Sequence, residues 1–80
     1  MKSIDEQVIE IVARAALIPS AKVTPEATLS ELGIGSMEQI ECVLALEERF
    51  RVELGESSLW QLRTVKDVID TIKRALAVNA

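Results

Sequence analysis

Apolar residues recur three or four positions apart in three stretches of the chain, a spacing that places them on one face of a helix. In the first stretch, Ser3 and Glu6 form the Ser-x-x-Glu pattern that pairs free N–H groups at a helix start. Pro19 follows the last apolar position and stops the helix. We therefore expect a first helix over about residues 3–17, with a buried stripe made of Ile4, Val8, Ile11, Val12 and Ala15.

The next segment, residues 18–35, has the composition of a long connection. Pro25 interrupts it, and Gly33 and Gly35 lie near its end. Its apolar residues would anchor it to the core, and they are Leu29, Leu32 and Ile34. An ordered loop of this length is often a functional one.

A second helix is predicted from Ser36 to about Phe50. Ser36-Met37-Glu38-Gln39 repeats the capping-box pattern, with Ser36 as the cap, and apolar residues follow at helical spacing. The apolar residues from the loop onward are expected to lie mostly in the core: Ile34, Met37, Ile40, Val43, Leu44, Leu46, Leu54, Leu59 and Leu62.

Two further helical segments follow Gly55, which breaks the chain. Leu59 and Leu62 are three residues apart and indicate a short helical turn, and Thr64 starts the last helix. The buried stripe of that helix consists of Val65, Val68, Ile69, Ile72 and Leu76. The predicted fold is all-α, a single domain over residues 1–80 that forms a small four-helix bundle, with three long helices, one short helix and a long loop after the first.

Composition excludes several classes of function. The chain has no histidine and one cysteine, Cys42, so catalytic triads that use histidine, His/Cys metal sites and internal disulfides are excluded. We expect no catalytic residue and no metal ligand, and we expect Cys42 to pack in the core. The first residues do not form a signal peptide and no apolar run could span a bilayer, which predicts a cytoplasmic protein. Trp60 has two open interpretations, a partner contact or a ring packed on neighbouring side chains.

Acidic residues are concentrated in the middle of the chain. The net charge is −4, and residues 26–56 hold eight acids and two bases, so that this stretch alone carries −6. This distribution argues against a nucleic-acid partner, which would need clustered Lys and Arg, and favours a basic protein partner.

Ser36 is the main candidate for chemistry. Its hydroxyl is predicted at the tip of a helix beside two glycines, where a partner enzyme could reach it. Free N–H groups and the helix dipole would favour a phosphodiester at that position. The residues alone also allow a simpler role, because serine is a frequent helix cap worth about 1 kcal/mol.

The segment Leu32-Gly33-Ile34-Gly35-Ser36-Met37, followed by a helix that ends in Leu46-Glu47-Glu48-Arg49-Phe50, resembles the acyl carrier protein family. The family signature reads Leu-Gly-x-Asp-Ser-Leu, with a later Leu-Glu-Glu-x-Phe pattern. The resemblance implies that a phosphopantetheinyl transferase moves phosphopantetheine from coenzyme A onto Ser36, and that the arm carries an acyl group as a thioester. It implies a monomeric carrier, not an enzyme, that serves fatty-acid, polyketide or related biosynthetic enzymes.

The same resemblance implies a docking surface. In the family, acidic residues of the second helix bind basic patches on partner enzymes, including the transferase and the acyl-loading and acyl-processing enzymes. Here that role falls on Glu38, Glu41, Glu47 and Glu48, although each also has the ordinary explanation of a solvated helix face.

Two departures from the family pattern indicate a specialised carrier. Gly35 replaces the usual acid before the serine, which normally helps the transferase hold its metal and substrate. Arg49 and Arg51 add positive charge where the family is often acidic. Two other functions remain open: an aminoacyl or peptidyl carrier, and an unmodified adaptor that binds through its acidic face.

Overall fold

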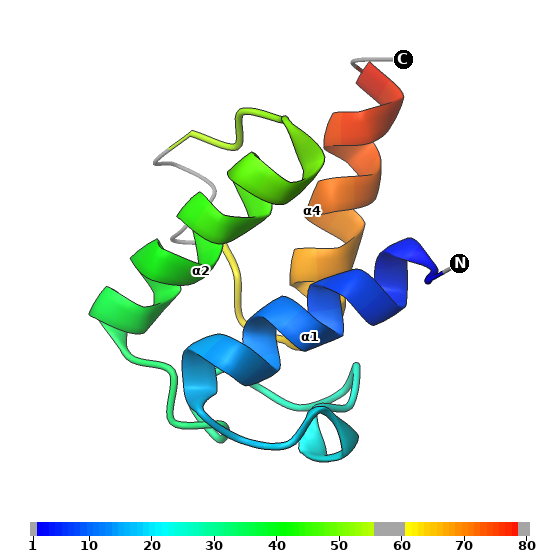
Figure 1. Ribbon diagram of the computed structural model, residues 1–80. Coiled ribbons are helices and arrows are strands. Elements are labelled where there is room, and N and C mark those ends of the chain that lie inside the picture. Colours follow the sequence, from blue (N-terminus) through cyan, green and yellow to red (C-terminus); the bar gives the residue numbers. More distant parts are fainter. Residues whose placement is uncertain (1, 56–60, 79–80) are drawn as a thin grey trace.

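Three long helices form a compact bundle in the computed structural model, which describes residues 2–55 and 61–78 (Figure 1). These are α1 (Ile4–Ala16), α2 (Ser36–Phe50) and α4 (Val65–Val78), and a short 3₁₀ helix, η1 (Ser20–Lys22), follows α1. In Figure 1, α1 (blue) lies below α2 (green) and α4 (orange to red), and it packs against both. The all-α bundle is confirmed, whereas the expected short helix near Leu59 and the position of Trp60 lie outside the described residues.

Local side-chain hydrogen bonds set the ends of α1. The Ser3 hydroxyl accepts from the Glu6 N–H at 3.1 Å, and the Glu6 carboxylate accepts from the Ser3 N–H at 3.3 Å. At the other end, Leu17 adopts a left-handed conformation with φ 58°, and its N–H donates to the Ala13 and Arg14 carbonyls. The predicted helix over residues 3–17 is thus confirmed, with Ser3 and Leu17 as its caps.

The long loop after α1 is held in place by backbone hydrogen bonds to the segment that enters α4. The Leu29 N–H donates to the Arg63 carbonyl at 2.9 Å, and the Val65 N–H donates to the Ala27 carbonyl at 3.0 Å. Leu29 and Ile34 are buried, as expected of anchors, and Leu32 is partly buried. The start of α2 is therefore positioned by the core rather than by a free loop.

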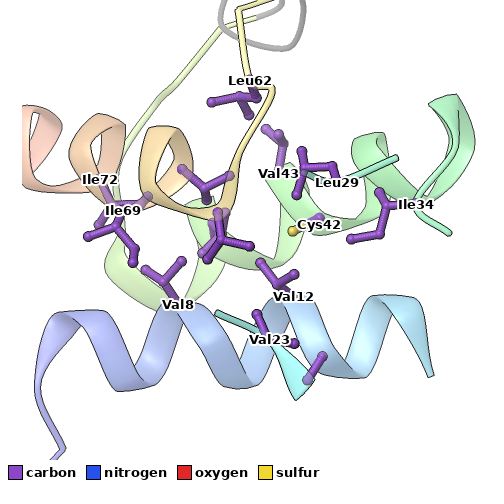
Figure 2. Packing of buried hydrophobic residues seen from close by; sticks show 14 of the residues in the cluster. Val8, Val12, Val23, Leu29, Ile34, Cys42, Val43, Leu62, Ile69 and Ile72 are labelled. Carbon is purple, nitrogen blue, oxygen red and sulfur yellow. The ribbon is translucent and has the colours of Figure 1, made fainter. Parts of the chain in front are cut away.

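The core lies where the three helices and the loop meet (Figure 2). Figure 2 shows Val8 and Val12 pointing from α1 toward the other helices, with Ile69 and Ile72 of α4 on the side of Val8. Cys42 is also buried there, and burial raises the pKa of its thiol to about 11. A thiol held in this protonated form behaves as a small apolar side chain, which confirms the predicted packing role. None of the helices within the described ranges is long and apolar enough to cross a membrane.

Candidate functional site

Ser36 is the first residue inside α2, and Gly35 is its N-cap. The Gly35 carbonyl accepts from the Gln39 N–H at 2.9 Å, and the Gly35 N–H donates to the Glu38 carboxylate at 2.8 Å. The prediction that Ser36 caps the helix and pairs with Gln39 was therefore wrong by one position. A charged carboxylate makes a stronger hydrogen bond than a neutral amide, so Glu38 takes the reciprocal position in place of Gln39.

This shift leaves the Ser36 side chain free of a structural role. The residue is exposed, and its hydroxyl makes no hydrogen bond with any other part of the chain that the structure describes. It also lies in the first turn of α2, where backbone N–H groups lack carbonyl partners within the helix and the helix dipole is positive. An oxygen at this position is accessible to another protein, and an anionic group attached to it would be stabilised.

The turn before Ser36 combines rigidity with open space. The Glu31 carboxylate accepts from the Thr28 hydroxyl at 2.8 Å and from the Thr28 N–H at 3.1 Å, and these two bonds hold the pKa of Glu31 below its usual value. Gly33 follows with φ +80°, a left-handed conformation that glycine adopts without strain, and a side chain there would meet no atom within 4 Å. Ile34 is buried two residues before Ser36. The serine is therefore held by a fixed turn and remains uncovered on its glycine side, so the residues present fit a phosphopantetheine attached to Ser36.

The four glutamates predicted to form the docking surface divide into two pairs. Glu38 caps α2, and a Glu47 carboxylate oxygen accepts from the Leu54 N–H at 2.9 Å, which ties the following loop to the helix. Glu41 and Glu48 are exposed and make no ion pair or hydrogen bond within the described residues. Only this second pair is free to meet a partner without breaking an internal contact.

Sequence reasoning missed an exposed apolar surface beside Ser36. Met37, Ile40 and Leu44, here called the outer stripe of α2, expose 71%, 48% and 59% of their surface, whereas they were expected to lie mostly in the core. They face away from α1 and α4 because the buried side of α2 is already formed by Cys42, Val43 and Leu46. The signal was present in the sequence, since α2 has apolar residues on two faces and one face suffices for packing in a bundle.

Comparison with known proteins agrees with this geometry. A family model described as the phosphopantetheine attachment site matches residues 6–72. The fold is similar to the crystal structure of an acyl carrier protein from Thermotoga maritima, with a TM-score of 0.81 and 27% identity, covering 92% of this chain and 87% of that one. It is also similar to the solution structure of the oxytetracycline acyl carrier protein, with a TM-score of 0.78 over 100% of this chain and 87% of that one, where 15% identity shows the fold alone. The chain therefore belongs to the phosphopantetheine attachment family and has the fold of an acyl carrier protein.

Proposed function

We propose that Ser36 carries the phosphopantetheine arm and that the protein holds acyl intermediates as thioesters for biosynthetic enzymes. The observation that supports this most is the free, exposed Ser36 hydroxyl in the first turn of α2, inside the range that the family model matches. Ser3 is a weaker candidate because its hydroxyl is engaged with Glu6. Ser20 and Ser30 are exposed but lie in the loop after α1, away from the start of a long helix.

The chain's own contribution to the modification is to present one nucleophilic oxygen. The Ser36 oxygen forms a new bond to the phosphate next to the pantetheine of coenzyme A, and the bond from that phosphate to the nucleotide part breaks. The nucleotide leaves as adenosine 3′,5′-bisphosphate, and the hydroxyl proton passes to a base of the transferase. The free N–H groups in the first turn of α2 would stabilise an anionic group attached to Ser36. Once attached, the arm supplies a terminal thiol that binds the acyl group, and partner enzymes catalyse the reactions.

Partner docking is assigned to the outer stripe of α2 together with Glu41 and Glu48. Positions 41, 44 and 48 follow one another at three- and four-residue intervals, so the two carboxylates flank Leu44 on one side of the helix. Exposed apolar side chains beside unpaired carboxylates suit an enzyme surface that combines an apolar patch with Lys or Arg. The transferase and the acyl-loading and acyl-processing enzymes are the partners that we assign to this surface.

Intact-mass spectrometry tests the attachment. After incubation with coenzyme A and a broad-specificity transferase, the wild-type protein should gain one phosphopantetheine, the Ser36→Ala variant none, and the Ser30→Ala control the same as wild type. A wild-type protein that gains nothing would indicate an unmodified adaptor. Labelling of the Ser36→Ala variant would show that another residue is the attachment point.

Loss of labelling in the Ser36→Ala variant must not come from unfolding. Because Gly35 rather than Ser36 caps α2, we expect the free energy of unfolding to change by less than about 0.5 kcal/mol, as for an ordinary surface substitution. Urea denaturation measures this change. The thioester recovered on the protein from its native cell then separates a fatty or polyketide acyl carrier from an aminoacyl carrier.

A further inference from the structure

Two adjoining pockets, together called the groove, lie between α1 and α2, and they meet the surface assigned to docking at Glu41. One end is lined by Lys2, Gln7, Glu10 and Arg49, and the other by Ala15, Glu41, Cys42 and Ala45. Ile11 and Arg14 line both ends, so the two pockets adjoin each other at these residues. The shared middle therefore combines one apolar side chain, Ile11, with one cation, Arg14.

The end of the groove near the N-terminus is positively charged. The Lys2 ammonium lies 2.6 Å from a Glu10 carboxylate oxygen, and this hydrogen bond, together with the charges of Lys2, Arg49 and Arg14, lowers the pKa of Glu10. Lys2 thus pairs with this carboxylate, and Arg14 and Arg49 line the same end of the groove. An acidic protein of net charge −4 has here a local surface of the opposite sign.

The two arginines are arranged to receive a ligand. The Arg49 Nε donates to the Gln7 side-chain oxygen at 3.1 Å, which holds this α2 side chain over α1. The Arg14 guanidinium makes no hydrogen bond or ion pair with the part of the chain that the structure describes, and the residue is exposed. A guanidinium binds carboxylates through paired hydrogen bonds, so Arg14 has unused capacity for an acidic group.

We propose that this groove binds an acidic segment of a partner protein. Carboxylates of that segment pair with Arg14 and Arg49, and a small apolar side chain rests on Ile11 and Ala45. A nucleic acid fits less well. The acidic residues 26–56 would repel its continuous phosphate backbone, and the few cations of the groove would not offset that repulsion.

Most of the groove and most of the docking surface lie on different sides of α2, and Glu41 borders both. Leu44 and Arg49 are five residues apart, which separates them by about 140° around a helix of 3.6 residues per turn. A partner in the groove therefore leaves Ser36 and Leu44 accessible to a second enzyme. The inference concerns charge and shape alone, so it holds whether or not Ser36 is modified.

Nuclear magnetic resonance of the unmodified, ¹⁵N-labelled protein tests the proposal. The probe is a short synthetic peptide of alternating glutamate and alanine, compared with the same peptide containing glutamine for glutamate. We expect saturable amide shift changes at Gln7, Ile11, Arg14, Ala45 and Arg49 with the glutamate peptide only. These changes should weaken as salt rises, because exposed charges are screened beyond about 8 Å at physiological ionic strength.

Charge reversal provides the matched comparison. The double variant Arg14→Glu, Arg49→Glu should bind the glutamate peptide at least about tenfold more weakly. The control Lys66→Glu, Arg74→Glu changes the net charge equally on exposed positions of α4 and should bind within about twofold of wild type. Dispersed amide spectra for both variants show that each is folded.

Several results would overturn the proposal. Absent or non-saturable shifts in the wild type, or an equal loss of binding in the α4 control, would leave the groove without a specific role. Stronger competition by a single-stranded oligonucleotide would point to nucleic acid. Shifts in the groove that depend on protein concentration alone would make a second copy of this chain the occupant.

Discussion

The glycine before Ser36 is the residue at which this chain departs most clearly from the carrier signature. Gly35 has φ −87° and ψ −170°, an extended conformation that any residue adopts, so the backbone does not require glycine there. A Cβ at this position would lie 2.9 Å from the Glu38 carboxylate oxygen. That oxygen ends a flexible side chain and can move, and an aspartate at position 35 could itself accept a hydrogen bond from the first turn of α2.

Gly35→Asp should speed modification by a broad-specificity transferase. The substitution restores a carboxylate next to the Ser36 hydroxyl, the proposed attachment point, where the carrier signature has one. The measurement is the initial rate of phosphopantetheine transfer. Gly35→Asn is the control, because it has nearly the same shape without the charge and should react at about the wild-type rate.

An unchanged or slower rate for Gly35→Asp would contradict this expectation and would mean that the carboxylate of Glu38 or other features suffice for the transferase. Equal acceleration by both variants would assign the effect to the cap and not to the charge.

Helix α2 is the element that serves both the core and the surface. Its inner side packs Cys42, Val43 and Leu46, and its outer stripe is exposed between Ser36 and Glu48. This division leaves the exposed side of α2 available for the proposed docking surface while the inner side stays in the core.

Reversing the charge of both Glu41 and Glu48 to lysine should slow association with a partner enzyme more than it speeds dissociation. Exposed charges mainly steer the encounter, so the effect should also shrink at high salt. Stopped-flow or surface-based kinetics with the transferase measure both rates. The variant Glu26→Lys, Glu53→Lys is the control, since it changes net charge equally at exposed positions outside α2.

If the two double variants slowed association equally, only net charge would matter, and Glu41 and Glu48 would not belong to the docking surface. An unchanged association rate of the Glu41, Glu48 variant at low salt would also exclude these two residues from the docking surface.

The start of α4 predicts a dependence of stability on pH. The Asp67 carboxylate accepts from the Thr64 and Arg63 N–H groups, each at 3.1 Å, and these bonds hold the pKa of Asp67 below its usual value. The stabilisation is therefore fully present above the unfolded-state pKa of about 4 and is lost as pH falls through the lower folded-state pKa.

Asp67→Asn should accordingly lower stability at neutral pH and make less difference in strong acid. Thermal unfolding between neutral pH and about pH 2 measures the difference in melting temperature between variant and wild type. This difference should narrow below about pH 4. Asp70→Asn, one turn further along α4, is the control. If the difference in melting temperature between Asp67→Asn and wild type stayed constant with pH, the charge of the Asp67 carboxylate would contribute nothing to the cap.

At the scale of the whole molecule, stability rests on a small core shared by all three helices. Leu46 is fully buried, whereas Leu44, two residues before it on α2, exposes 59% of its surface. The same substitution at each leucine therefore compares a buried position with an exposed one on a single helix.

Leu46→Ala should lower the free energy of unfolding by about 2–5 kcal/mol, because it removes apolar contacts and leaves a cavity. Leu44→Ala should change it by less than about 0.5 kcal/mol and should instead weaken partner binding. Urea denaturation measures the change in the free energy of unfolding for both variants. Equal losses of stability would mean that Leu44 belongs to the core after all.

The limits of α1 and the start of α4 were predictable from sequence, since they depend on residues close together in the chain. Ser3 with Glu6, and Thr64 before α4, set helix starts through contacts three residues apart. Ser36 was singled out by its motif, and its role as the attachment point stays a prediction. The short helix near Leu59, the role of Trp60 and the cytoplasmic location stay predictions.

The tertiary structure decided which face of each element is used. Glu38 rather than Gln39 completes the cap of α2, Glu47 is engaged with the loop that follows, and the outer stripe is exposed. Arg49 reaches Gln7, 42 positions away, and so helps to form the groove. Local patterns indicate which residues can be buried, but the packing of distant segments determines which of them are covered. The reason is that each helix of a small bundle has more apolar and charged surface than its neighbours can cover.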